Sequence, residues 1–355
     1  MRRLLFTLFG ALVAFAASAQ TSLPLEKGLP VVVRPAVAYV EIFDFDENAA
    51  TFRATIDLRL RWDDLRLRRP AAEAKDPPRV FRGAEAEAAA KKIWIPDIAI
   101  ANQAGEAAGP TDVGLRIFAD GRVELMRRIT AVFSTAYDVS RFPFGEQQLE
   151  VRLVVRDLTA NQLGLAFDQN GLDFSRAVAG AELDGWDLGF VNLSVEPLAG
   201  WYGTSHSTLT ASLRITRRPG PTIAAIFVPL LASLLIPLLT IWLNRAEEDG
   251  TFNVEAFELV NIIIGGLFAV IALNFTVNSV FEVLESGDNP VNRLFTLNYI
   301  TLAVCLAVNV LFGRFNVVGG LLGNYVQEQF YRFLMWAIPA MVLITAASII
   351  LVAVA

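Results

Sequence analysis

The chain has 355 residues, of which 54% are hydrophobic, with a mean hydropathy of +0.47 and a formal net charge of −6. This hydropathy exceeds that of ordinary soluble proteins, and the acidic balance argues against nucleic acid as a partner. One cysteine and one histidine exclude an intrachain disulfide framework and a zinc cluster. No nucleophile–base, metal-ligand or phosphate-loop motif occurs, so we expect no cofactor and no enzymatic activity.

The first residues follow the pattern of a secretory signal peptide. Arg2 and Arg3 precede an apolar run from Leu4 to Ala17, and Ala17-Ser18-Ala19 fits a cleavage site before Gln20. The alternative is a fifth membrane helix, for which this apolar run is short. We therefore expect residues 1–19 to be removed and the mature chain to begin outside the cytoplasm.

Residues 20–219 show the alternation of apolar and polar residues that is typical of half-buried strands. A strand at Thr51–Trp62, for example, is apolar at every second position from Phe52 onward. Asp120-Gly121 predicts a hairpin turn, because this dipeptide favours the required backbone conformation. About ten short strands separated by turns predict a β-sandwich. Further strands are expected at 37–45, 113–117, 123–133, 149–155, 191–195 and 209–215, with a short helix at 84–92.

Residues 220–355 are expected to form a membrane domain. Four long stretches carry no Asp, Glu, Lys or Arg. Each is long enough to cross a bilayer as a helix, which takes about 20 apolar residues. We expect the four helices at 221–243, 256–281, 293–313 and 331–354.

The second of these segments differs from a lipid-facing anchor. Between Glu258 and Glu282 it has no charged residue, yet it holds amides and hydroxyls. Such groups are costly at membrane depth unless they face protein or water. Steps of three and four residues place one set of side chains on a single helix face, with the terminal carboxylates about 36 Å apart. This set, which we call the pore line, is Glu258, Asn261, Gly265, Phe268, Ala272, Phe275, Ser279 and Glu282.

Two interpretations fit the pore line. Several copies around an axis would enclose a channel with acidic rings at its mouths, or the helix is a buried member of a four-span bundle whose amides bridge neighbours. In a channel, Phe268 and Phe275 would form the gate, because a narrow apolar constriction loses its water. The alternative is that both rings pack between helices.

The polar residues around the pore line lead to two further expectations. Glu258 at the inner mouth predicts selection of cations over anions, because a ring of carboxylates concentrates cations. Asn274 and Asn278 lie off the line and are expected to bond to a neighbouring helix. More acidic residues precede Glu258 in the same loop, namely Glu255, Glu247, Glu248 and Asp249.

Several short motifs occur in one consistent order from about residue 35 to the end. Residues 137–144, YDVSRFPF, resemble the signature loop of pentameric ligand-gated ion channels, in the bacterial form that lacks the loop cysteines. The ordered set of motifs and the four spans together give the resemblance its specificity. The other motifs are WDD at 62–64, WIPD at 94–97, GWD at 185–187, Arg217 followed by Pro229, and IALN at 271–274.

The resemblance implies a homopentamer in a lipid bilayer. Residues 20–219 would form an extracellular β-sandwich ligand-binding domain, and 220–355 a four-helix transmembrane domain whose second helix lines the pore. The implied function is a cation-selective channel that is gated by a small-molecule agonist or by protons and passes monovalent cations. The implied location is the cell inner membrane, with the N-terminal domain in the periplasm. The alternative is a non-conducting sensor or binding protein with the same fold.

The resemblance also implies residues that couple the extracellular domain to the pore. Family members often have FPFD in the signature loop, whereas here Gly145 follows Phe144 and the carboxylate comes one residue later. This departure puts the ion pair with the pre-membrane arginine in question, and acids of an early turn are a second candidate. The alternative is that these charged side chains only keep the tip of a loop hydrated and have no role in coupling. The coupling candidates are Asp46, Glu47, Phe142, Pro143, Phe144, Glu146 and Arg217.

The candidate ligand site departs from that of amine-gated family members. Asp57, Ala101 and Arg156 stand at the positions of their aromatic box, and only Trp201 and Tyr202, in the capping loop, supply aromatic rings. Two interpretations of Arg156 stay open. It holds a small carboxylate by a bidentate contact under the aromatic pair, or it pairs with an acidic residue at the subunit interface.

Overall fold

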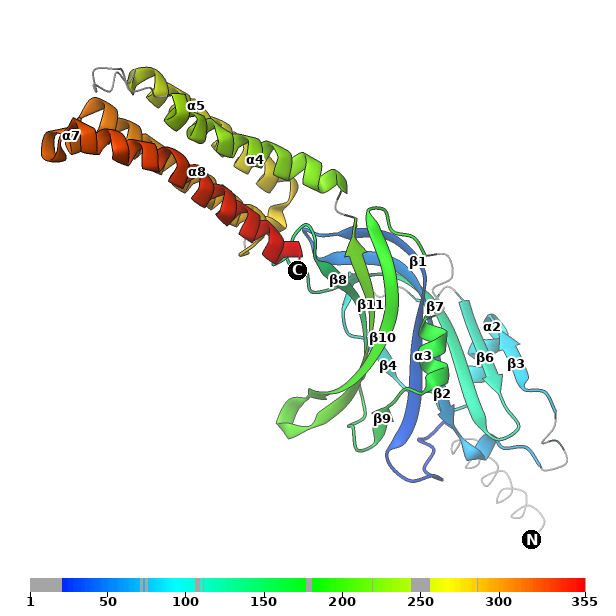
Figure 1. Ribbon diagram of the computed structural model, residues 1–355. Helices are drawn as coiled ribbons and strands as arrows, with labels where there is room; N and C mark the ends of the chain where they lie inside the picture. The colour runs from blue at the N-terminus through cyan, green and yellow to red at the C-terminus, as the bar shows by residue number, and fades with distance from the viewer. Residues whose placement is uncertain are drawn as a thin grey trace, which may run out of the picture. The chain divides into compact units, whose positions relative to one another are not determined.

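The computed structural model describes residues 21–70, 73, 76–105, 109–110, 112–176, 181–218, 220–243, 256–285 and 287–354 (Figure 1). The expected signal peptide and the acidic residues 247–249 and 255 lie outside this range. The chain divides into two compact units. The sheet unit holds the residues up to Tyr137 together with Gln147–Ile215, and the helix unit holds Asp138–Glu146 and the residues from Thr216 onward. The signature loop therefore belongs to the helix unit, and the expected domain boundary at 219 stays a prediction.

The sheet unit is a sandwich of two sheets, as the alternating sequence pattern predicts. The larger sheet has the strand order β3-β6-β7-β2-β1-β9, with β5 paired to β7, and the smaller has the order β10-β11-β8-β4. The strands of the larger sheet are β1 (Val31–Asp46), β2 (Thr51–Asp63), β3 (Arg79–Arg82), β5 (Gln103–Ala104), β6 (Asp112–Ile117), β7 (Arg122–Ser134) and β9 (Leu163–Leu165). Those of the smaller sheet are β4 (Ile98–Ile100), β8 (Glu146–Val155), β10 (Trp186–Ala199) and β11 (Ser205–Arg217).

The predicted alternation decides which side chains enter the core. Every second residue of β2 from Phe52 to Trp62 is at most 2% exposed, because successive strand residues point to opposite faces. The predicted hairpin at Asp120-Gly121 is confirmed between β6 and β7. Gly121 has φ +88°, and a Cβ there would lie 2.7 Å from the carbonyl oxygen of Asp64. Only glycine fits this turn without strain.

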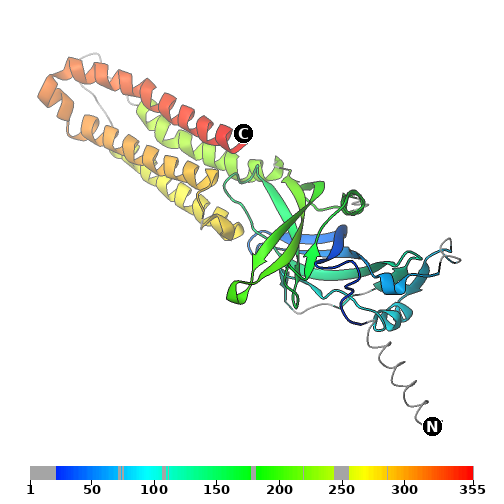
Figure 2. The ribbon, with the colours of Figure 1, turned by 90° about the horizontal axis from the view of Figure 1, so that it is seen from below.

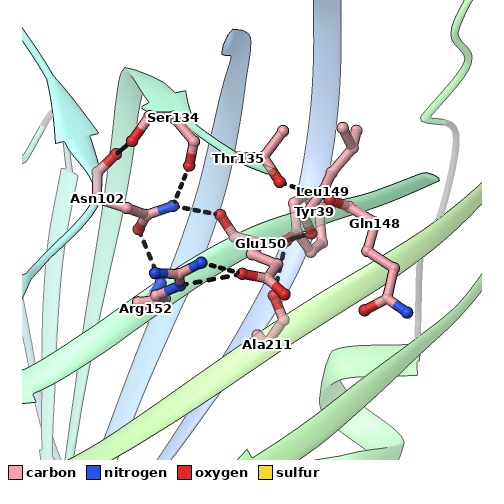
Figure 3. Close-up of polar contacts among 9 residues, drawn as sticks. All are labelled: Tyr39, Asn102, Ser134, Thr135, Gln148, Leu149, Glu150, Arg152 and Ala211. Atoms are coloured by element: carbon pink, nitrogen blue, oxygen red, sulfur yellow. Dashed lines mark hydrogen bonds and ion pairs between the residues drawn. The ribbon is translucent and has the colours of Figure 1, made fainter. Parts of the chain in front are cut away.

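A buried tyrosine ties the two sheets together (Figure 3). The hydroxyl of Tyr39, in β1, donates to Leu149 O at 2.7 Å and lies 3.0 Å from Ala211 O, so one side chain reaches β8 and β11 of the other sheet. Burial, and then the charge of Glu150, raise the pKa of Tyr39 far above its ordinary value, so the hydroxyl keeps its proton.

Two short helices flank the sheets. The helix expected at 84–92 is present as α2 (Ala84–Ala90). A second helix, α3 (Gln169–Arg176), was not expected from the sequence and packs against β1 and β10. Its start is fixed by Asp168, whose carboxylate accepts a hydrogen bond from Gly171 N at 2.7 Å and also binds Arg61. The strand partner of Asp168 is distant in sequence, which explains why local periodicity did not indicate this helix.

Four helices of the helix unit are long and apolar enough to cross a membrane. They run side by side in both views (Figures 1 and 2). The second packs against the first and third, and the fourth packs against the same two helices. A short helix, α7 (Val317–Leu322), precedes the fourth. The long helices are α4 (Gly220–Leu243), α5 (Ala256–Val280), α6 (Pro290–Val308) and α8 (Asn324–Val354).

Two of the expected helix bounds need correction. The third helix begins at Pro290 rather than 293, because the Asn289 side chain accepts a hydrogen bond from Asn292 N and proline suits the first helical position. Its α-helical part ends at Val308, followed by a wider turn at Asn309–Arg314. The fourth helix begins at Asn324 rather than 331, because a helix can continue through polar residues that a search for uncharged stretches excludes.

Buried polar side chains connect the helices within the bundle. Asn298 of α6 donates to Leu230 O and to Ser233 Oγ of α4, and Asn309 donates to Thr240 Oγ1 at 3.1 Å. Such bonds replace the hydrophobic driving force that lipid removes between helices. The Trp242 indole N–H donates to Met335 O at 2.9 Å. Pro339 leaves that carbonyl without its helical partner, so the tryptophan compensates for the proline.

Candidate functional site

The pore line forms an exposed face of α5 on the single chain. All eight of its residues are exposed, including Phe268 at 67% and Phe275 at 76%. The amide of Asn261 has no hydrogen-bond partner among the described residues. The hydroxyl of Ser279 instead donates to Thr276 O of its own helix. The face therefore combines two large apolar rings with an unsatisfied amide.

Glu282 departs from the expected line. Helix α5 ends at Val280, and Phe281 has φ −121° and ψ 73°, which breaks the helical path. Glu282 begins a separate 3-10 turn that runs to Leu284. The expectation of one unbroken helix face from Glu258 to Glu282 is thus corrected at its outer end, because the ring of Phe281 packs against Phe142.

The opposite face of α5 packs inside the helix unit. Gly266 allows the closest approach, since a Cβ at this position would lie 3.1 Å from Ile236 Cγ2 of α4 and 3.3 Å from Leu302 Cδ2 of α6. A Cβ at the adjacent Gly265, on the pore line, would meet no other atom within 4 Å. The buried residues of this packed face are Leu259, Ile263, Gly266, Val270 and Val277.

The two amides that lie off the pore line are arranged in a short chain. Asn278 Nδ2 donates to Asn274 Oδ1 at 2.7 Å, and Asn274 Nδ2 lies 3.3 Å from the hydroxyl oxygen of Tyr299 on α6. The expected bond to a neighbouring helix is confirmed for Asn274. Asn278 bonds instead within its own helix, one turn away.

The signature loop is held by aromatic contacts with the helices. Phe142 is 2% exposed, and its ring centroid lies 5.2 Å from that of Phe281. The guanidinium of Arg217 lies over the Phe142 ring at 5.1 Å, which is a cation–π contact. Phe144 contacts Phe227 of α4, with ring centroids 5.8 Å apart. These rings give the pre-membrane arginine a partner in the loop that does not depend on an aspartate after Phe144.

The acidic coupling candidates have local partners. Asp46 caps its turn by accepting a hydrogen bond from Ala49 N at 3.0 Å, and Glu47 accepts one from the Tyr137 hydroxyl at 2.6 Å. In the loop itself, hydrogen bonds from Ser140 lower the pKa of Asp138, so this carboxylate is ionised at neutral pH. Pro143 is buried, and Glu146 is exposed at the first position of β8.

The ligand-site candidates do not form one closed pocket on the single chain. Asp57 makes a bidentate ion pair with Arg128, at 2.7 and 2.8 Å. Arg156 is exposed at the end of β8. Trp201 and Tyr202 are 85% and 100% exposed in a 3-10 turn, where no side chain of the described residues covers them. Arg156, Trp201 and Tyr202 are therefore accessible on the single chain, whereas the carboxylate of Asp57 is already bound by Arg128.

Asn102 fixes the backbone of the loop that carries Ala101, a role that motif matching missed (Figure 3). Its Nδ2 donates to Ser134 O and Glu150 O, both at 2.7 Å, and its Oδ1 accepts from Arg152 N at 2.9 Å. Asparagine side chains often satisfy loop backbone in this way, so an asparagine between two strands was the available signal. Among the described residues, no group of three or more His, Cys, Asp or Glu side chains could hold a metal ion.

Comparison with known proteins adds family information to this geometry. Residues 18–219 match the family model of the neurotransmitter-gated ion-channel ligand binding domain, which is more than half of the chain. A proton-gated ion channel of Gloeobacter violaceus is 29% identical over 255 residues, or 70% of this chain and 64% of the relative. The glycine receptor subunit beta of Rattus norvegicus is 25% identical over 67% of this chain and 48% of the relative. The neuronal acetylcholine receptor subunit alpha-2 of the same species is 28% identical over 34% and 23%.

These relatives are named as a channel and as receptors, not as enzymes. The matched part of this chain spans less than two thirds of each relative's own length. The family model and the four apolar helices agree with the ordered motifs of the sequence.

Proposed function

The chain belongs to the pentameric ligand-gated ion channel family, and on this premise we propose that it assembles as a homopentamer and forms a gated, cation-selective channel. In this assembly five copies of α5 surround the axis, and the pore line faces the ion path. The sheet unit lies in the periplasm and the helix unit in the cell inner membrane.

The observation that carries the proposal is the exposed amide of Asn261. It lies in the first half of α5, on the exposed face of the helix, and it has no partner among the described residues. A lipid-facing amide without a partner is costly, whereas water in a pore satisfies it. The same face carries Gly265, Ala272 and Ser279, which leave room for an ion path.

Cation selectivity is supported by Glu258. Its side chain is exposed in the first turn of α5, at the end of the pore line. Five such carboxylates would make an acidic ring, which raises the local concentration of cations and repels anions. Monovalent cations such as sodium and potassium are therefore the expected permeating ions.

The gating stimulus is an extracellular ligand or protons. Protons are supported by the relative that is named as proton-gated and by the GWD motif at 185–187. A ligand at the subunit interface is supported by the exposed Arg156 and the uncovered rings of Trp201 and Tyr202. His206, the second residue of β11, is partly buried, and its Nδ1 lies 3.0 Å from Leu158 O in the segment that follows β8.

A planar bilayer that contains the purified full chain tests the proposal. We expect current after a drop in the pH of the extracellular side or after addition of an agonist from a ligand screen. Under a sodium chloride gradient, the reversal potential should follow the sodium gradient. A reversal potential that follows chloride would refute cation selectivity, and pentamers that never conduct under any stimulus would indicate a sensor with the same fold.

A further inference from the structure

A cavity of about 810 Å³ in the sheet unit is lined by helix α2, by strand β3 and by the segment that follows β2. Arg79 and Phe81 of β3 pair with Ile117 and Leu115 of β6. Paired residues share one side of a sheet, and Leu115 is fully buried, so this is the core side. Helix α2 packs against both strands (Figure 1). None of the ligand-site candidates lines this cavity, so it is a separate site.

Five cationic side chains line the cavity, and three of them have no partner among the described residues. These three are Arg68, Arg79 and Lys92, and all are exposed. They come from the end of the turn after β2, from β3 and from the segment that follows α2. The acidic residues of the described lining, Glu73 and Glu85, lie beyond ion-pair distance of them. The three cations are therefore available to an anion from outside the chain.

The other two cations are held by partners within the chain. Arg66 binds the buried carboxylate of Asp64 through hydrogen bonds of 2.7 and 2.8 Å, which raise the pKa of Arg66. Arg69 donates to Pro77 O at 2.9 Å and lies 3.9 Å from the carboxylate of Asp76. The Arg69 side chain is only 9% exposed, yet its Nε has no hydrogen-bond partner among the described residues. A buried N–H without an acceptor is costly, so this arginine is a further donor for a bound anion.

We propose that this cavity binds the phosphate group of a small phosphate monoester. Such a group carries a charge of about −1.5 to −2 at pH 7 and has three strong acceptor oxygens, one for each of the three cations. Arginine and lysine side chains both bind phosphate by charge-assisted hydrogen bonds. A carboxylate offers one charge and two oxygens, and so fits three cations less well.

The floor of the cavity fits the organic part of such a ligand. Apolar side chains meet there from four segments, and pockets for small molecules are mostly apolar with a few polar groups that fix the orientation. The proposal goes beyond channel function, because binding at this cavity requires neither conduction nor the capping loop. The apolar residues are Leu67, Phe81, Ile93 and Ile117.

The test is isothermal titration of the full chain in phosphatidylcholine nanodiscs with three matched sugars. Glucose 6-phosphate carries the phosphate monoester, glucuronate has a carboxylate at the same carbon atom, and glucose is neutral. We expect glucose 6-phosphate to bind, glucuronate to bind at least about tenfold more weakly, and glucose not to bind. Equal affinity for glucose 6-phosphate and glucuronate would overturn the assignment to phosphate.

Exposed residues of the lining can be replaced with little risk to folding. Arg79→Gln and Lys92→Gln should each weaken the binding of glucose 6-phosphate about tenfold or more, because a charge-assisted hydrogen bond is lost. Arg82→Gln is the matched control. Arg82 lies on the same strand, is also exposed and has no partner among the described residues, but it points to the other side of the sheet and does not line this cavity. Its replacement should leave the affinity unchanged.

Glu85→Gln provides a result of opposite sign. Glu85 lines the cavity from the first turn of α2, and its carboxylate repels a bound phosphate. Its replacement should therefore tighten the binding of glucose 6-phosphate several-fold. A loss of binding in this variant would contradict the proposal.

The phosphate monoester can be a free metabolite or the headgroup of a lipid. Sedimentation with phosphatidylcholine vesicles that contain phosphatidic acid distinguishes the two sources. Binding to these vesicles that Arg79→Gln abolishes, without binding of glucose 6-phosphate, would assign the phosphate to a lipid.

Three further results would overturn the proposal. The first is a wild-type chain that binds neither glucose 6-phosphate nor phosphatidic acid. The second is an unchanged affinity for glucose 6-phosphate in both Arg79→Gln and Lys92→Gln. The third is binding that is lost only in Arg156→Gln, which would move the site to the capping loop. A chain that binds glucose 6-phosphate but never conducts would refute the channel proposal and leave this one intact.

Discussion

The two faces of α5 differ both in their residues and in their surroundings. The packed face, with Ile263 and Val270, is buried inside the helix unit, whereas the pore line, with Phe268 and Phe275, is exposed on the single chain. Only 22% of the spanning part of α5 is buried inside the subunit, against 39%, 44% and 28% for the other three helices. Of the four spans, α5 therefore leaves the largest share exposed to other copies, water or lipid.

This difference separates two kinds of constraint on one helix. On the packed face, the available space limits which side chains are tolerated, because an added Cβ at Gly266 would come within 3.4 Å of neighbouring side chains. The pore line is exposed on the single chain, so under the proposed assembly we expect its residue types to reflect contacts with other copies or with water. Substitutions on the packed face should accordingly lower stability, whereas substitutions on the pore line should change conduction.

The largest effect is expected for the rings of the pore line. Phe268→Ala or Phe275→Ala should give current without any agonist, because a wider apolar constriction stays wet. A change from about 1% to about 99% open corresponds to about 5.5 kcal/mol. Phe275→Ala should leak more, because its neighbours Ala272 and Thr276 are small. Bilayer recording at resting pH measures the leak.

Leu267→Ala is the control for this pair. Leu267 is also an exposed large apolar residue of α5, at 37%, but it precedes Phe268 by one residue and so points about 100° away from it around the helix. It should give no leak. Misassembly without leak in the two pore-line variants would mean that both rings pack between helices of neighbouring subunits.

The next effect distinguishes the adjacent glycines. Gly266→Val should lower the free energy of unfolding of the subunit by about 1–3 kcal/mol, because the new valine side chain would collide with Ile236 and Leu302. Gly265→Val has open space within the subunit and should leave the stability near that of the wild type. Melting of the detergent-solubilised protein measures both. Equal destabilisation by the two variants would show that the assembly packs the pore line as tightly as the other face.

A smaller effect is expected at Asn274 and Asn278, the two hydrogen-bonded amides of α5. Asn274→Leu removes the contact with Tyr299 and leaves Asn278 without its acceptor, which should cost about 0.6–2 kcal/mol in assembly or gating. Tyr299→Phe removes only the hydroxyl and should cost less. Pentamer yield and the pH or agonist response report the change. If neither differs from wild type in Asn274→Leu, the amide pair does not hold the helices together.

The smallest effect is expected at the mouth of the pore line. Glu258→Gln should reduce the ratio of sodium to chloride permeability a few-fold, because the carboxylate ring loses its charge while the side-chain size is kept. Reversal potentials under a salt gradient measure the ratio. Glu247→Gln, in the preceding loop, should change it less. An equal change in both variants would place the selecting charges in the loop rather than on α5.

The sequence alone determined the features that depend on local periodicity. Alternation identified the β2 core positions, three- and four-residue steps identified the exposed face of α5, and charge-free stretches located the four long helices. These features follow from backbone geometry, which repeats every two residues in a strand and every 3.6 in a helix. The ordered motifs indicated the family that the family model then matched.

Only the tertiary structure decided which distant residues meet. It ended α5 at Val280 and packed Phe281 on Phe142, and it gave Arg217 a ring as its partner in the signature loop. It also brought Arg68, Arg79 and Lys92 from three segments of the sheet unit to one cavity. No local pattern encodes such meetings, because they depend on strand order, on helix ends and on side-chain packing between segments that are far apart in the chain.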